Sequence, residues 1–283
     1  MSMVGTKGEA VYGLRFQGEI RVRERGQGDH LWVDVAGNGA PVVLIHGLGA
    51  TATVFEPVSE RLLGSHKVIR FDLRGHGRSG RTDQPSVASW ANDLDWLLDS
   101  IPAASADFVG IGLGTLILEH FVATRPDRVD RMVLVNPLHG MAEQHRARYR
   151  ELAGSVRRDG LRVMLPQGDR EFGSMPETPP TILRALRREL LLAQDPEEYA
   201  AACDAIAASY TSDLAHTTAP TLVMVGADAT ESKASAQAVA ANVSSAEVVE
   251  LHGLADWPTI EQPAQVADRI ANFLAPGRIN GAA

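Results

Sequence analysis

The stretch Val109-Gly110-Ile111-Gly112-Leu113-Gly114-Thr115 places a glycine at every second position between two apolar segments. Residues 107–110, which lead into this stretch, are predicted to form a short buried strand. Residues 113–124, which begin at its end, are predicted to form a mostly apolar helix. Glycine adopts positive φ and the tight turns that need it at little steric cost. We therefore expect the chain to turn sharply at this stretch.

Apolar runs typical of buried strands alternate along the chain with segments whose apolar residues have helical spacing. Parallel neighbours need crossover helices, so this alternation predicts a parallel sheet with helices on both faces. Two segments that alternate polar and apolar residues predict a hairpin at one edge, with its turn at 26–29. We therefore predict an α/β fold with a mostly parallel eight-stranded sheet, whose strands are 18–25, 31–36, 41–45, 67–71, 107–110, 131–136, 221–225 and 247–251.

The alternation of strands and helices stops after residue 137 and resumes at about 219. We predict that residues 138–218 form a helical lid inserted into a core made of 1–137 and 219–283. Arginines in the inserted part are interleaved with acidic residues, which favours a solvated helical face over an anion-binding patch. Within the insertion the spacing predicts only helices, at about 141–158, 181–193 and 196–210.

The chain has 283 residues and a net charge of −8, from 27 basic and 35 acidic side chains. This balance gives no electrostatic footprint for nucleic acid or an anionic membrane, so neither is an expected partner. Cys203 is the only cysteine, which excludes an intramolecular disulfide and a thiolate metal site built from this chain alone. No apolar run approaches the ~18 residues of a membrane span. The sequence therefore predicts a soluble cytoplasmic protein without metal or other cofactor, and it leaves the oligomeric state open, a homodimer included.

Five short motifs follow one another along the chain: His46-Gly47-Leu48-Gly49, Asp72-x-Arg-Gly-His-Gly-x-Ser79, Gly110-x-Gly-x-Gly114, Gly226-Ala-Asp228, and Gly253-Leu-Ala-Asp256-Trp-Pro258 with Glu261-x-Pro263 after it. Their identity and order resemble the α/β-hydrolase fold family, in its branch of small lid-bearing enzymes. The resemblance covers residues 18–275. No single motif is decisive, but the five together are strong.

The resemblance implies three catalytic positions, in chain order a serine, an acid and a histidine. In this sequence the serine position is Gly112, the acid position is Asp228 and the histidine position is Asp256. The family's oxyanion hole uses two backbone N–H groups, which here belong to Leu48 and Leu113. Two catalytic side chains are therefore replaced, whereas the backbone donors need no particular side chain.

The two replaced positions each have two interpretations. Gly112 either relieves strain in a protein released from catalysis or makes room for a substrate carbon or a water. Asp256 is either a solvated loop carboxylate or a general base whose pKa is raised by burial.

Other residues near these positions are further candidates. His139 follows the strand 131–136 and either supplies the missing imidazole or is a surface histidine. His46, Gly47 and Trp257 are expected to line the pocket.

The leading hypothesis is a cofactor-free enzyme that carries out non-hydrolytic chemistry on a small carbonyl-containing metabolite. A lyase, isomerase or cyclase with a biosynthetic role fits, with Leu48 and Leu113 as oxyanion donors and Asp256, His139 or Asp228 as the base. A second hypothesis is a catalytically silent ligand-binding or scaffold protein. A third is a hydrolase in which a base activates water. Fold alone does not choose among them.

Overall fold

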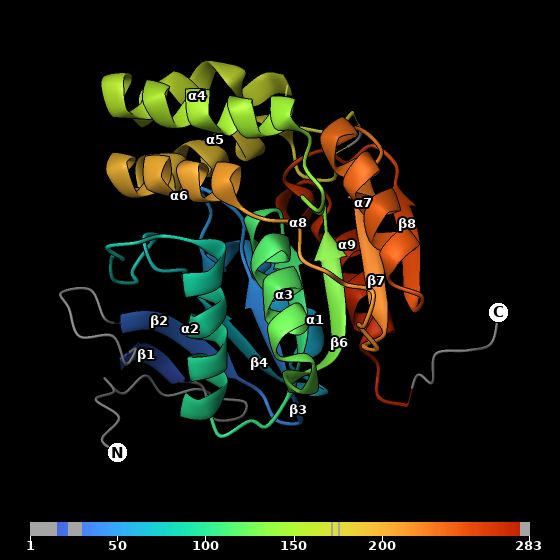
Figure 1. The fold of residues 1–283 in the computed structure, drawn as a ribbon. Coiled ribbons are helices and arrows are strands. Elements are labelled where there is room, and N and C mark those ends of the chain that lie inside the picture. The colour runs from blue at the N-terminus through green and yellow to red at the C-terminus, as the bar shows by residue number, and fades with distance from the viewer. Residues whose placement is uncertain (1–15, 22–29, 171, 175, 278–283) are drawn as a thin grey trace.

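The computed structural model describes residues 16–21, 30–170, 172–174 and 176–277. These residues form an eight-stranded sheet in the order β1-β2-β4-β3-β5-β6-β7-β8 (Figure 1). β2 pairs antiparallel with β1 and β4, and the other neighbours are parallel, which confirms the predicted fold class. The hairpin turn predicted at 26–29 lies outside the described residues. The strands are β1 (Phe16–Arg21), β2 (His30–Ala36), β3 (Ala40–Ile45), β4 (His66–Phe71), β5 (Ala106–Ile111), β6 (Val129–Val135), β7 (Thr221–Gly226) and β8 (Ala246–Leu251).

Helices cover both faces of the sheet because its central strands bury alternate side chains on opposite sides. In β3, Val43 and Ile45 belong to one apolar core, and Val42 and Leu44 belong to the other. The first core is closed by α2 (Val87–Ser100), α3 (Leu113–Thr124) and α7 (Thr230–Asn242), and the second by α1 (Glu56–Leu62) and α9 (Pro263–Phe273).

The described chain between β6 and β7 contains helices and no strand. Figure 1 shows α4, α5 and α6 stacked together beyond the end of the sheet to which the β6 arrow points. We call this part the helical segment. It has an apolar cluster of its own, in which Cys203 is fully buried. Its elements are α4 (Glu143–Asp159), η3 (Leu161–Arg170), α5 (Pro180–Leu192) and α6 (Pro196–Ala208).

The turn from β5 into α3 has the sharp geometry that the sequence predicts. Gly112 lies at φ +53° and ψ −112°, a conformation that favours glycine. The flanking glycines are needed for a different reason. A β-carbon on Gly110 would lie 2.6 Å from the carbonyl oxygen of Gly114, and one on Gly114 would lie 2.3 Å from that of Ile45. The turn therefore packs backbone against backbone, both within itself and against β3.

We expect Gly114→Ala to lower the free energy of unfolding by about 1–3 kcal/mol, because the added methyl group overlaps a backbone oxygen that cannot move independently of β3. Urea unfolding followed by circular dichroism measures the change. Gly64→Ala is the matched control, since a β-carbon there meets no described heavy atom within 4 Å. Equal unfolding midpoints for the two variants would contradict the steric argument.

Candidate active site

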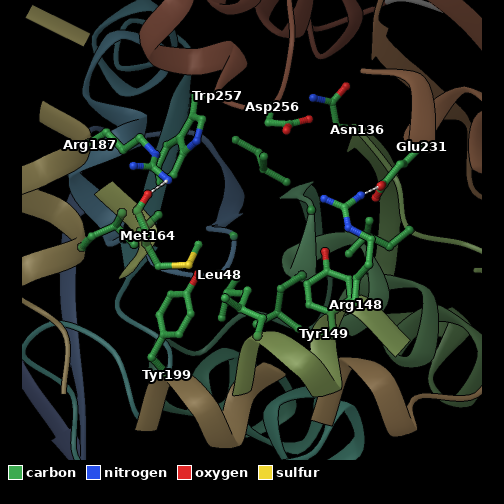
Figure 2. Close-up of a pocket in the computed structure, with 18 of the residues that line it drawn as sticks. Leu48, Asn136, Arg148, Tyr149, Met164, Arg187, Tyr199, Glu231, Asp256 and Trp257 are labelled. Carbon is green, nitrogen blue, oxygen red and sulfur yellow. Dashed lines mark hydrogen bonds and ion pairs between the residues drawn. The ribbon is translucent and has the colours of Figure 1, made fainter. Parts of the chain in front are cut away.

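A cavity of about 570 Å³ lies between the sheet and the helical segment. Both sides contribute apolar and polar residues. In the view of Figure 2, Asp256 and Asn136 lie on one side of the cavity, and Tyr149 and Tyr199 lie on the other. Lining residues include Gly47, Leu48, Gly112, Leu113, Asn136, Asp256 and Trp257 from the core, and Tyr149, Leu152, Met164, Arg187, Leu191 and Tyr199 from the helical segment.

Gly112 leaves open space where a side chain would project. A β-carbon built on it meets no heavy atom of the described residues within 4 Å. The next residue, Leu113, is the first of α3, where backbone N–H groups have no acceptor within the helix. The N–H of Leu48 lies in the loop after β3, and no described residue accepts a hydrogen bond from it. Two backbone donors and a space without a side chain thus adjoin the same cavity.

His46 is predicted to line the pocket, but the structure buries it completely outside the set of residues that line the cavity. Its Nδ1 lies 2.9 Å from the carbonyl oxygen of Gly47, and its Nε2 accepts a hydrogen bond of 3.0 Å from the N–H of Leu73. Burial lowers the pKa of His46, which keeps the ring neutral. His46 therefore shapes the loop that carries the Leu48 amide. Gly47 does line the cavity, as predicted.

Asp256 lines the cavity from the loop between β8 and α8 (Pro258–Glu261). The residue is solvent-exposed, so it is not the buried carboxylate of the general-base interpretation. The backbone on each side of it is held by Glu261, which is fully buried. Glu261 Oε2 accepts from the N–H of Ala255 at 3.0 Å, and Oε1 accepts from the N–H of Trp257 at 2.7 Å. Oε2 also accepts from the N–H of Gly173 at 2.6 Å. The position of Asp256 is therefore fixed by a neighbouring carboxylate.

Asn136 completes this support from the end of β6. It lies in the left-handed region at φ +48° and is buried. Its Nδ2 donates to the carbonyl of Ala255 at 2.6 Å, and its Oδ1 accepts from the N–H of Gly226 at 2.9 Å. One amide side chain therefore ties together the ends of β6 and β7 and the loop that carries Asp256.

The other two candidate bases lie elsewhere. His139 is buried against α3, where its Nδ1 lies 2.9 Å from Oε2 of Glu119, and it does not line the cavity. Burial raises the pKa of Glu119, and the hydrogen bond from His139 opposes that shift. Asp228 is exposed and accepts two hydrogen bonds of 2.8 Å from Ser174, which lower its pKa. Of the three predicted bases, only Asp256 reaches the cavity.

Several lining residues were not singled out by the sequence reasoning. Trp257 was predicted to line the cavity and does so. Four other residues line it without having been predicted: Tyr149, Tyr199, Asn136 and Arg187. Asn136 ends a predicted strand at the edge where α/β sheets place their ligands, and this position was an available signal. The side chains of the helical segment gave no such signal, because helical spacing alone does not say which residues face the cavity.

Within the described ranges, no group of three or more histidine, cysteine or acidic side chains is arranged to hold a metal ion. Nor does any described helix combine the length and apolarity needed to cross a membrane.

The alpha/beta hydrolase family model matches residues 42–269. The chain belongs to the alpha/beta hydrolase family. Solved structures of that fold superpose over almost the whole chain. A thermophilic esterase from Thermogutta terrifontis has a TM-score of 0.81 at 24% identity, over 91% of this chain and 98% of that one. An enol-lactonase from Burkholderia xenovorans has a TM-score of 0.78 at 24% identity, over 91% and 99%.

Curated relatives within the alpha/beta hydrolase family match over shorter stretches. The (E)-2-((N-methylformamido)methylene)succinate hydrolase of Acinetobacter baylyi is 30% identical over 133 residues, 46% of this chain and 50% of that protein. The pimeloyl-acyl-carrier-protein methyl ester esterase of Chromobacterium violaceum is 38% identical over 109 residues, 38% of this chain and 40% of that protein. The chain thus spans half or less of the length of these relatives.

We expect Glu261→Gln to lower the free energy of unfolding by about 1–3 kcal/mol, because the amide nitrogen cannot accept from the backbone N–H groups that face it. Chemical unfolding measures the loss. Glu60→Gln, an exposed position on α1, is the control and should change stability by less than about 0.5 kcal/mol. A Glu261→Gln variant as stable as the control would show that this carboxylate does not hold the loop.

His76, which packs against His46, makes the stability of the protein depend on pH. Its ring packs edge-on against His46 at 5.3 Å between centroids, and burial followed by repulsion from His46 lowers the pKa of His76 to about 3. The unfolded pKa of about 6.5 is higher, so between pH 6.5 and 3 the unfolded chain binds more protons. The contribution of His76 to stability is therefore complete above pH 6.5 and is lost as the pH falls.

We expect His76→Phe to remove up to about 1.4 kcal/mol per pH unit from the slope of unfolding free energy between pH 6.5 and 4.5. His76 Nε2 is buried without a hydrogen-bond partner among the described residues, so phenylalanine removes only the long contact of 3.4 Å between Nδ1 and the carbonyl oxygen of Arg74. Urea unfolding at several pH values gives the slope. His216→Phe, at an exposed histidine, should leave it unchanged, and the same slope in both variants would refute the assignment.

Proposed function

We propose that this alpha/beta hydrolase is a cofactor-free enzyme without a serine nucleophile, which uses Asp256 as a general base in non-hydrolytic chemistry on a small carbonyl compound. A lyase, isomerase or cyclase reaction fits this description. The observation that carries the proposal is the meeting of three features in one cavity: the N–H groups of Leu48 and Leu113, the open space at Gly112, and the Asp256 carboxylate.

In this proposal the substrate carbonyl oxygen accepts hydrogen bonds from Leu48 and Leu113. The Asp256 carboxylate removes a proton from the neighbouring carbon, and the electrons of the C–H bond form an enolate. Each backbone donor that is aimed at the developing negative charge contributes about 2.7–4 kcal/mol to the stabilisation of the transition state. Gly112 has no side chain to attack the carbonyl and leaves room for the reacting carbon.

The helical segment has a role in this mechanism. We propose that residues 138–218 act as a lid on a core of 1–137 and 219–283. Tyr149, Leu152 and Leu191 from this segment line the cavity opposite the core. Side chains that displace water lower the local dielectric constant, and the interaction between the oxyanion and the backbone donors is then stronger.

A second candidate function is hydrolysis, in which Asp256 activates a water molecule held in the space at Gly112. The names of the relatives favour it, since those with a curated activity include hydrolases and esterases. Water is a reactant in hydrolysis but not in the enolate chemistry. Only hydrolysis must place an oxygen atom from water in the product.

To identify the substrate, the protein is incubated with a bacterial metabolite extract in heavy-oxygen water, and mass spectrometry detects compounds that change. We expect a product without heavy oxygen in the wild type. Asp256→Asn should abolish its formation by at least ~10²-fold, because an amide cannot accept the proton. Asp127→Asn, at an exposed position beside β6, is the control and should match the wild type.

The outcomes separate the candidate functions. Heavy oxygen in the product would replace the lyase, isomerase or cyclase proposal with hydrolysis by activated water. Full turnover in Asp256→Asn would remove Asp256 from the mechanism. No change in any compound would favour a silent binding protein.

A further inference from the structure

Tyr149 lines the cavity, and its hydroxyl group has no role in the proposed proton abstraction by Asp256. Tyr149 comes from α4 in the helical segment and lines the cavity together with Asp256. Figure 2 shows its oxygen directed into the cavity, toward the side on which Asp256 and Asn136 lie. No described residue forms a hydrogen bond with this hydroxyl. A polar atom that faces a cavity and has no partner in the described protein is available to a ligand.

The ring of Tyr149 is held firmly, so its hydroxyl has a defined place. It packs against two apolar clusters, one under α2 and α3 and one inside the helical segment. Leu48, whose N–H adjoins the cavity, packs against the same two clusters. The side chains of Tyr149 and Leu48 therefore pack against the same two apolar clusters, which hold the phenol and the Leu48 amide near each other.

The surroundings also keep the phenol protonated. Burial raises the pKa of Tyr149 well above its usual value, and the negative charge of Asp256 adds to the effect. A neutral phenol is a hydrogen-bond donor over the whole physiological pH range. Asp256, by contrast, is a carboxylate that accepts protons, so the two groups have complementary roles.

We propose that Tyr149 donates a hydrogen bond to a substrate oxygen that gains negative charge while Asp256 accepts the substrate proton. This inference rests on the proposed function. The C–H electron pair becomes a carbon–carbon π bond, the carbonyl π pair moves to oxygen, and Tyr149 keeps its proton while it stabilises that oxygen. The ligand class is a carbonyl compound with an acidic C–H bond beside the carbonyl group.

The first test is kinetic. Cyclohexanone and ethyl acetoacetate serve as probes in deuterated water, and proton NMR follows exchange beside their carbonyl groups. We expect the wild type to accelerate exchange and Asp256→Asn to abolish it. Tyr149→Phe, which removes only the hydroxyl, should lower kcat about 10²-fold. Tyr210→Phe is the matched control, because Tyr210 is 91% exposed, and should match the wild type. If Tyr149→Phe exchanges as fast as the wild type, the role of Tyr149 is overturned and the role of Asp256 is unaffected.

A second test needs no turnover and separates failure of this inference from failure of the proposed function. The four tyrosines are replaced by 3-fluorotyrosine, and each fluorine signal is assigned by its loss in a Tyr→Phe variant. We expect Asp256→Asn to lower the pKa of Tyr149, because the repelling carboxylate is gone, and cyclohexanone to shift the Tyr149 signal in the wild type. A Tyr149 signal that responds to neither change overturns the inference, whether or not the protein catalyses exchange.

Discussion

The buried carboxylate of Glu261 joins three parts of the molecule, and the site depends on it. Its side chain accepts hydrogen bonds from the residues on either side of Asp256 and from Gly173 of the inserted chain. Its backbone carbonyl accepts two more, from the N–H groups of Glu177 and Thr178. A buried carboxylate is costly unless its oxygens are well bonded, and these donors supply what it needs. The same bonds hold the Asp256 loop and attach Gly173, Glu177 and Thr178 to the core.

The other half of the site depends on steric contact between backbones. Gly114 lets α3 begin directly against β3, which brings the Leu113 amide to the cavity beside the loop of Leu48. The glycines at 110 and 114 are required for this packing whatever the chemistry, so they say nothing about activity. Gly112 is different, because a β-carbon there meets open space. Its positive φ still favours glycine, so the backbone conformation and the open cavity each account for a glycine at this position.

The sequence predicted the sheet and the turn because both depend on local signals, whereas Asp256 was singled out by the family resemblance. Alternating apolar runs identify buried strands, and a short glycine pattern identifies the turn. It failed where a role depends on contacts between distant segments. His139 seemed well placed beyond its strand, but Glu119, 20 residues earlier, holds it away from the cavity. The bond between Gly173 and Glu261 joins residues 88 positions apart, and no periodicity reports such a contact.

The proposed base and the proposed hydrogen-bond donor come from different parts of the chain, and this constrains how the site works. Asp256 is fixed to the core, whereas Tyr149 is fixed to α4. Arg148, the residue before Tyr149, forms an ion pair with Glu231 of α7 and so connects α4 to the core beside the cavity. This pair is largely exposed and therefore weak, so it can open to admit a ligand at small cost. The bonds of Glu261 are buried and should persist. The proposed base is thus held by the core and the proposed donor by α4, so the proposed site needs both parts of the chain.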